Sequence, residues 1–454
     1  MDNDFRRALG PWSASALIAG SMIGTGIFFF VADVAVRLPS RPWILAAWLV
    51  GAAIASCGAL SLAELAAAYP ETGGIYVFLH RAFGPAVAFL YSWAKLLIMR
   101  PGSFAIMAVA FTGFYLELLG LGTGSPAWLR RAIAIDVILL LTIVNMIGVR
   151  AGAGVQNVLT AVKVLAVVAV IGVGGAYALG LLRAHAVTIE PKAAEGGFLL
   201  LLFGAALIPV MWTYGGWDEA PFVAEEVRDP GRNLPLAIVA GVAAVALLFV
   251  LVNGAYLAIL SPSEMAATGG RTATVAMERA LGGGARGLLS VALMVSTFGA
   301  ANGLALTGGR IAYATGRGQA LFRWFGRTNP RTRTPVRGLA LQALLAIAAL
   351  LLFANPFQLL LYTGLAYWVF AGLTAAAVVV LRRRDPQRER PFRVWAYPVT
   401  PALFILASLG MAVSVAVTST RNALITVGIV VAGAVVYGVQ ALAFRGGRLT
   451  PSDS

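Results

Sequence analysis

The sequence holds few side chains of the kinds that enzymes use for covalent or metal chemistry. It contains one cysteine, Cys57, inside an apolar run, and two histidines, His80 and His185, that are far apart. These three residues form neither a zinc-ligand set nor a cysteine–histidine pair. A polar catalytic cluster near a membrane interface is also absent from the sequence. We therefore expect no enzyme, no metal and no cofactor.

Glycine clusters inside two apolar runs are the residues whose spacing does point to chemistry. They are Gly20-Ser-Met-Ile-Gly-Thr-Gly-Ile-Phe28 and Trp212-Thr-Tyr-Gly-Gly-Trp217. Glycine is unfavourable inside a helix, and irregular backbone at membrane depth survives only where protein or a water-filled cavity satisfies it. A break exposes N–H groups that suit a carboxylate and carbonyls that suit an ammonium. The two breaks predict a backbone site for an α-amino acid; close helix packing is the alternative explanation.

Cations inside the apolar runs are the second group of candidates. A lysine deep in a membrane helix costs roughly 2.5–3.5 kcal/mol, so Lys163 needs a partner or a task. Its amine is expected to reach the first break, unless it snorkels to the inner surface. Lys95 and Arg100 are expected to form structural ion pairs or to line a vestibule, with Glu117 or Asp136 as candidate partners; contact with the substrate is the alternative.

The composition requires a membrane. Of 454 residues, 59% are hydrophobic and 12% are charged, against roughly 45–50% and about 25% in soluble chains. A membrane-spanning helix needs about 20 apolar residues. That criterion predicts an all-α protein with twelve transmembrane helices, at 11–36, 42–69, 84–117, 132–149, 153–182, 197–224, 234–260, 286–315, 337–354, 357–381, 397–418 and 422–444.

The net charge of +15 reflects membrane topology and gives no reason to expect nucleic acid as a partner. With an inside N-terminus, twenty basic residues fall in inner segments and ten in outer ones. This asymmetry predicts that both termini are cytoplasmic and that the protein is a multi-pass protein of the cell (inner) membrane. Two six-arginine connections, 317–337 and 382–393, are expected to face the cytoplasm and touch anionic lipid of the bilayer.

The two breaks fall in the first helices of two five-helix groups, 11–182 and 197–381. An odd number of helices per group turns the second group upside down, which predicts an inverted repeat with its binding site at the breaks. Helices 11 and 12 follow at 397–444. The remaining segments, 1–10 and 445–454, are expected to be a cytoplasmic N-terminus and tail.

Several stretches resemble the L-type amino acid transporter group of the amino acid–polyamine–organocation (APC) superfamily. They are GSMIGTGIF (20–28), AELAAAYPETGGIYVFLHRAFGP (63–85), WAKLLIMRPGS (93–103), WTYGGWDEAPFVAEEVRDPGRNLPLAI (212–238), STFGAANG (296–303) and RPFRVW (390–395). The resemblance covers residues 11 to 400. It implies a leucine-transporter (LeuT) fold with broken helices 1 and 6, alternating access, and sodium-independent amino acid transport, often by exchange.

The resemblance also implies roles for individual residues. The amino acid would contact a set of residues at the two breaks, with Trp212 as its aromatic lid: Met22, Ile23, Gly24, Thr25, Gly26, Trp212, Tyr214 and Gly215. Thr25 and Gly26 would offer N–H groups, and Met22, Trp212 and Gly215 would offer carbonyls. Lys163 would replace a sodium ion, with Ser296 or Thr297 as its partner. Tyr256 is a candidate gate; the alternative is a residue of the interfacial aromatic belt.

Three departures from the family pattern limit what the resemblance implies. No proline follows GIF, where the sequence runs from Phe29 to Asp33, and Asp218 stands where an amide is common. The outer connection 118–131 has no cysteine, so we expect no disulfide-linked heavy chain and a stand-alone, bacterial-type transporter. The roles of Asp33 and Asp218 stay open.

The leading hypothesis is a sodium-independent exchanger or facilitator for neutral L-amino acids. A proton-coupled carrier of cationic amino acids or amines is the alternative within transport, with Lys163 as its proton site and Asp218 as the nearby acid. A non-transporting amino acid sensor on the same fold is the alternative from another class.

Overall fold

The computed structural model describes residues 11–24, 26–70, 74–147, 152–218, 227–318, 324–330, 332, 334–353 and 355–445. The first half of the chain folds into α1 (Pro11–Met22), α2 (Gly26–Phe29), α3 (Val31–Arg37), α4 (Arg41–Ala68), α5 (Ile75–Phe83), α6 (Pro85–Ala94), the π-helical turn η1 (Lys95–Met99), α7 (Arg100–Leu118), the 3-10 turn η2 (Gly122–Gly124), α8 (Ala127–Ile147) and α9 (Gly152–Ala178).

The second half begins with the broken helix and ends with two long helices on the outside of the bundle. Its elements are α10 (Leu199–Thr213), α11 (Pro230–Ile259), α12 (Pro262–Ala267), α13 (Thr272–Leu281), α14 (Gly283–Gly318), α15 (Val336–Leu352), α16 (Pro356–Arg384), α17 (Val399–Thr418) and α18 (Thr420–Arg445). The described residues contain no β-strand, as the all-α prediction requires.

Each of the twelve predicted membrane segments overlaps at least one of these helices. Among the described residues, eight helical segments are long and apolar enough to cross a membrane: α4, α6–η1–α7, α9, α11, α14, α16, α17 and α18. A ninth span results if Ile18–Phe29 and Val31–Arg37, which meet at 53°, are counted together. Helices α10 and α15 are shorter, and α8 carries three charges, Arg130, Arg131 and Asp136.

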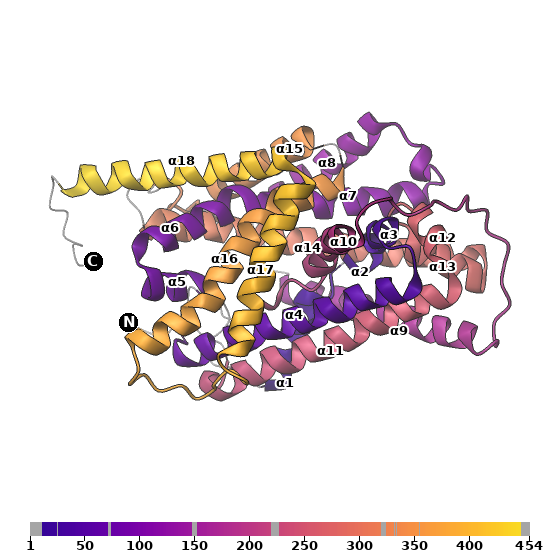
Figure 1. Cartoon of the computed structure of the whole chain (residues 1–454). Helices are drawn as coiled ribbons and strands as arrows, with labels where there is room; N and C mark the ends of the chain where they lie inside the picture. Colours follow the sequence, from indigo (N-terminus) through magenta and orange to yellow (C-terminus); the bar gives the residue numbers. More distant parts are fainter. Residues whose placement is uncertain are drawn as a thin grey trace.

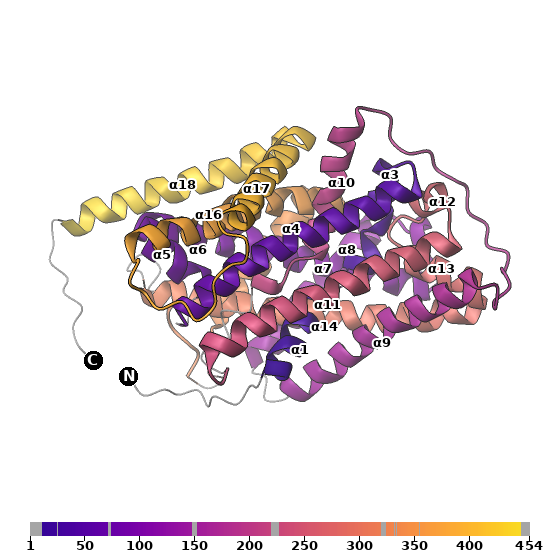
Figure 2. The same ribbon diagram turned by 60° about the horizontal axis from the view of Figure 1, so that its bottom comes forward.

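The helices form one bundle, and its two ends differ (Figure 1). Helices α3, α12 and α13 lie at one end together with the connection 179–198, and α5 lies at the other end near the connection 385–398 (Figures 1 and 2). Inside the bundle, α4 packs along α11, and α7 packs along α14. Of these helices, α4, α7 and α14 contribute to the wall of the cavity described below, together with α16.

Glycines on α4 bring the second broken span close. A Cβ atom on Gly51 would lie 2.5 Å from Val210, and one on Gly58 would lie 2.8 Å from Trp217, which follows α10. Small residues at these positions let helix backbones approach each other closely, which is how helices associate where no water drives them together. The position of α10 therefore depends on the small face of α4.

The connection 179–198 is fastened to three elements at its end of the bundle by backbone hydrogen bonds. The N–H of His185 donates to Arg279, that of Lys192 to Ser263, and that of Glu195 to Val36, over 2.8, 3.0 and 2.7 Å. Nearby, Glu264 closes a capping box on Ser261. Burial raises the pKa of the Glu264 carboxyl, but hydrogen bonds from Ser261 and Arg279 lower that pKa by more than burial raises it. The pKa therefore lies below its usual value.

A buried glutamate holds the opposite end together. Glu64, at the end of α4, is 2% exposed and accepts two hydrogen bonds from Arg382, at 2.7 and 2.6 Å. The backbone N–H of Val394 donates to the same carboxylate over 2.7 Å, and Arg390 lies 3.7 Å from it. Glu64 therefore joins α4, α16 and the connection 385–398.

Replacing Glu64 with glutamine should destabilise the protein, because Arg382 and Arg390 would lose their shared anion. Breaking a fully buried pair costs about 3–5 kcal/mol; Arg382 is partly exposed, so we expect on the order of 2 kcal/mol. A lower melting temperature in detergent is the measurement. Glu389→Gln, which changes an exposed carboxylate of the same connection, is the control and should melt like the unmodified protein. Equal melting of all three proteins would contradict the role given to Glu64.

Candidate substrate-binding site

The first break separates α1 from α2. Helix α1 ends at Met22, the N–H of Ile23 still bonds back to Ala19 over 2.7 Å, and the N–H of Gly24 turns to the Met22 carbonyl over 2.7 Å. Helix α2 begins at Gly26 and is followed, after Phe30, by α3. The helix is therefore interrupted where the glycine cluster predicts it, although Thr25 lies outside the described residues.

The second break follows α10. The helix ends at Thr213, and the N–H of Gly215 donates to the Trp212 carbonyl over 3.0 Å. Gly216 has a φ of 107°, a left-handed conformation that glycine adopts readily and other residues avoid. The chain therefore leaves the helix at the pair Gly215 and Gly216, as expected.

The two breaks touch each other through backbone. A Cβ atom on Gly216 would lie 2.8 Å from the carbonyl oxygen of Ser21 and 3.2 Å from the Cα of Met22. A Cβ atom on Gly26 would lie 2.6 Å from the hydroxyl of Thr213. Sequence reasoning chose Gly215 and missed Gly216, for which the doubled glycine was the available signal. Gly216 and Gly26 are both required, because the two broken spans meet at these positions and leave no room for a side chain.

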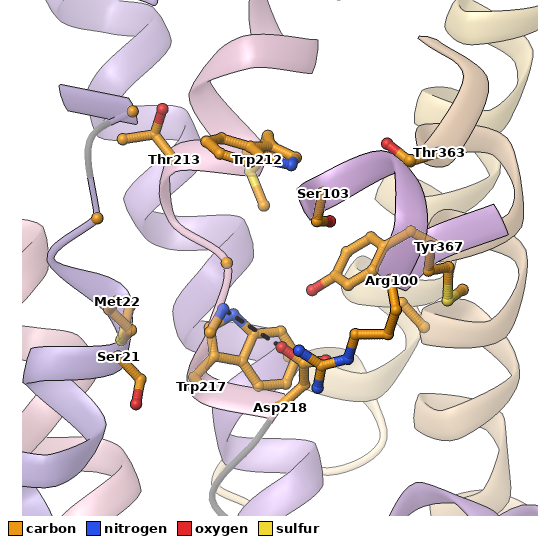
Figure 3. A pocket seen from close by; sticks show the side chains of 18 of the residues that line it. Ser21, Met22, Arg100, Ser103, Trp212, Thr213, Trp217, Asp218, Thr363 and Tyr367 are labelled. Carbon is orange, nitrogen blue, oxygen red and sulfur yellow. Dashed lines mark hydrogen bonds between the residues drawn. The ribbon is translucent and has the colours of Figure 1, made fainter. Parts of the chain in front are cut away.

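A cavity of about 730 Å³ lies against these breaks, within the range of small-molecule sites. Helices α7, α14 and α16 supply much of the rest of its wall. Of the predicted contact residues that the structure describes, five line it: Met22, Gly24, Gly26, Trp212 and Gly215. Figure 3 shows Trp212 and Met22 among the side chains around this space.

Three predicted residues do not line the cavity, and their assignment is corrected. Ile23 is 2% exposed and belongs to the apolar core. Tyr214 turns away from Trp212, and its hydroxyl donates to the Trp48 carbonyl over 3.1 Å. Tyr256 is fully buried near the end of α11 and does not line the cavity. Tyr214 therefore packs toward α4, whereas Trp212 lines the cavity.

Four charged side chains line the cavity: Lys95, Arg100, Lys163 and Asp218. Lys95 lies on the π-helical turn η1, and its ammonium donates to the Tyr91 hydroxyl over 2.9 Å. Such turns are frequent at functional sites because they reset the direction of the following helix, and no sequence signal announced this one. Lys95 and Arg100 both line the cavity, which agrees with the lining role that the sequence predicted beside an ion pair.

The two acids proposed as partners of Lys95 and Arg100 lie elsewhere. Glu117 is buried and bonds to Arg286 over 3.2 Å and to Thr274 over 2.9 Å, which joins α7 to α13 and α14. Asp136 is exposed on α8. The pairing predicted for them was wrong because Glu117 is bound by Thr274 of α13 and Arg286 of α14, and Asp136 faces away from the cavity.

Asp218 sits on the cavity wall immediately after the second break. Its carboxylate accepts a hydrogen bond of 3.3 Å from the N–H of Gly216. In Figure 3 the guanidinium of Arg100 points toward this carboxylate from α7. Asp33, the other acid left open by the sequence, lies outside the cavity and faces Arg37 within α3, 4.0 Å away.

Trp212 belongs to an outer aromatic cluster, which we define as Phe29, Phe30, Phe114 and Trp212. The rings of Phe30 and Trp212 meet edge to face with centroids 5.2 Å apart, and Phe29 contacts Phe30 and Phe114 at 5.1 and 6.2 Å. A Cβ atom on Gly270, between α12 and α13, would lie 3.1 Å from Phe29. The cluster therefore separates the cavity from the end of the bundle that carries α12 and α13.

Lys163 reaches the cavity, but its predicted partners on α14 do not. Lys163 is 3% exposed and lines the cavity from α9, so it does not snorkel to the surface. Thr297 donates to carbonyls of its own helix, at Leu293 and Met294, and Ser296 is buried beside it. No hydrogen bond from Lys163 to either residue occurs in the described part of the chain.

A bundle of apolar helices around a central cavity, walled by two broken spans, defines a membrane transporter. A sequence profile of the family described as amino acid permease matches residues 9–439. The chain belongs to this family of the APC superfamily and is an amino acid transporter with several membrane-spanning helices.

Individual relatives extend this assignment. The chain is 33% identical over 406 residues to the mouse b(0,+)-type amino acid transporter 1, covering 89% of this chain and 81% of the relative. It is 28% identical over 438 residues to the serine/threonine exchanger SteT of Bacillus subtilis, covering 96% and 97%. It is 31% identical to the large neutral amino acids transporter small subunit 2 of the rat, covering 88% and 74%. These relatives are transporters and not enzymes.

Gly216→Ala should strongly lower transport, because the added Cβ atom would collide with the Ser21 carbonyl and alanine is strained in a left-handed backbone conformation. A fall in initial exchange rate of about tenfold or more is expected, since strain and contact act together. The matched control is Gly175→Ala on α9, where a Cβ atom meets nothing within 4 Å; its rate should be unchanged. Near-normal exchange by Gly216→Ala would show that the contact between the breaks is dispensable.

Proposed function

We propose that this chain is a sodium-independent exchanger or facilitator of neutral L-amino acids that works by alternating access. The observation that carries the proposal is the contact of two broken spans at the wall of a cavity of about 730 Å³. We further propose a LeuT-like arrangement in which 11–182 and 197–381 are inverted five-helix repeats, followed by two extra helices in 397–444.

In this proposal the amino acid is bound by backbone at both breaks. Its carboxylate accepts hydrogen bonds from N–H groups at Thr25 and Gly26, where α2 begins. Its ammonium donates to the carbonyls of Met22, Trp212 and Gly215. The Met22 and Trp212 carbonyls already accept from Gly24 and Gly215, but each carbonyl oxygen has a second lone pair.

The charges around the cavity support a neutral substrate over a cationic one. Among the lining residues that the structure describes, three are basic and Asp218 alone is acidic. The carboxylate of Asp218 accepts a hydrogen bond from the Gly216 N–H and is faced by Arg100. Its negative charge is therefore already balanced by the positive charge of Arg100. The names of two relatives, a serine/threonine exchanger and a large neutral amino acids transporter, favour neutral substrates and, for the first, exchange.

The sidedness of the protein is also part of the proposal. The arginine-rich connection 385–398, clamped by Glu64, would lie in the cytoplasm with both termini, and α12 and α13 would face outward. Cys57, the one cysteine, lies inside α4, where no disulfide to a second chain can form in the bilayer. We therefore propose a stand-alone carrier of the inner membrane.

Counterflow in proteoliposomes, with a panel of amino acids and with or without sodium and a pH gradient, tests the proposal.

Lys163→Ala should lower exchange about tenfold or more, because the buried ammonium that stands in for an ion is lost. Lys192→Ala, which removes an exposed ammonium, should exchange normally. Accumulation driven by a sodium gradient would contradict sodium independence, and normal exchange by Lys163→Ala would contradict the role of that lysine.

Trp212 should act as a lid, because it covers the cavity and packs on Phe30. Trp212→Ala should lower the initial exchange rate about tenfold or more, while Trp212→Phe keeps part of the activity through its remaining apolar area. Melting temperatures measured beside these rates separate a lid from a packing residue. If the two variants lose melting temperature but keep most of their exchange rate, Trp212 is a core packing residue and not a lid.

A further inference from the structure

Two oppositely charged side chains from different spans face each other inside the cavity. Asp218 follows the second break and is oriented by the N–H of Gly216 over 3.3 Å. Arg100 is the first residue of α7, directly after the π-helical turn, and its side chain points toward Asp218 (Figure 3). Both line the cavity together with Ser103, one turn further along α7.

The place of this pair fits contact with the side chain of a bound amino acid. Met22 and Ser21 of the first span lie on one side of the cavity in Figure 3, and Arg100, Ser103 and Tyr367 lie on the other. An amino acid whose carboxylate and amine are bound at the breaks therefore points its side chain toward Arg100 and Asp218. This step rests on the proposed function.

The two side chains have complementary hydrogen-bonding chemistry. An ionised carboxylate only accepts and a guanidinium only donates. An acidic substrate side chain is attracted by Arg100 but repelled by Asp218, and for a basic side chain the two effects are exchanged, so neither charge gains from the pair as a whole. An apolar one removes water from both charges without replacing its hydrogen bonds. A carboxamide presents a donor and an acceptor on separate atoms, so it satisfies both groups at once.

We propose that Asp218 and Arg100 make the transporter selective for amino acids with carboxamide side chains, glutamine and asparagine. Hydroxyl side chains form the second-best class, because a single oxygen must serve both partners. The pair also explains how an acidic residue can line the cavity of a carrier for neutral substrates.

Competition between amino acids of matched shape tests this selectivity in proteoliposomes. The competitors are glutamine against methionine, asparagine against leucine and threonine against valine, with glutamate and lysine as charged probes. We expect glutamine and asparagine to compete about tenfold better than methionine and leucine, since each replaces hydrogen bonds to charged groups. Equal competition within the first two pairs would overturn the proposal.

Charge-removing variants add a readout that a structural role would not give. Asp218→Asn should improve glutamate relative to glutamine, because the repelling anion is gone. Arg100→Gln should improve lysine relative to glutamine, for the converse reason. Asp136→Asn and Arg130→Gln make the same chemical changes at exposed positions of α8 and should leave both ratios unchanged.

Within either variant, a shift of the glutamate and lysine ratios in the same direction, or no shift of either ratio, would overturn the proposal. If a variant does not fold, the matched competitors acting on the unmodified protein decide, together with Asp218→Glu and Arg100→Lys, which should keep glutamine ahead of glutamate and lysine. Absence of exchange with any neutral amino acid would defeat the proposed function itself. Exchange of neutral amino acids without a carboxamide preference would defeat this inference alone.

Discussion

The backbone polar groups of an interrupted helix must be satisfied at membrane depth, and the rest of this structure depends on how that is done. Hydrocarbon offers no hydrogen bonds, so irregular backbone is stable there only against protein or inside a wet cavity. Here the two breaks are placed against each other, with Gly216 on Ser21 and Gly26 on Thr213. The same arrangement that stabilises each break leaves backbone groups facing one cavity, which is why stability and binding share residues.

The surrounding helices position the two breaks and close the cavity around them. The small face of α4 lets α10 approach, as Gly51 and Val210 show. The π-helical turn before Arg100 sets how α7 presents its side chains to the cavity. The outer aromatic cluster closes the cavity toward α12 and α13, while Glu64 ties the opposite end together. Specific contacts therefore connect the helices at both ends of the bundle, on either side of the cavity.

Much of the fold was predictable because membrane helices have a strong sequence signal. Each apolar run of sufficient length became a helix, and the glycine clusters marked both interruptions. Single side chains were harder to place. Tyr214 and Tyr256 are polar-tipped aromatics in suitable segments, yet both are buried away from the cavity. Glu117 was expected near Arg100 from its position in the same span, but it bonds to Arg286 and Thr274 across helix boundaries.

The sequence by itself determined the membrane class, the helical segments, the two breaks and, through its motifs, the transporter family. Those properties follow from local composition, since an apolar run must be helical in lipid and a glycine cluster weakens a helix wherever it lies. Only the tertiary structure decided that Gly216 is the point of contact, that Asp218 faces Arg100, and that Trp212 packs on Phe30. These are pairings between segments far apart in the chain, and their geometry depends on helix rotation and on one π-helical turn, which no local pattern encodes.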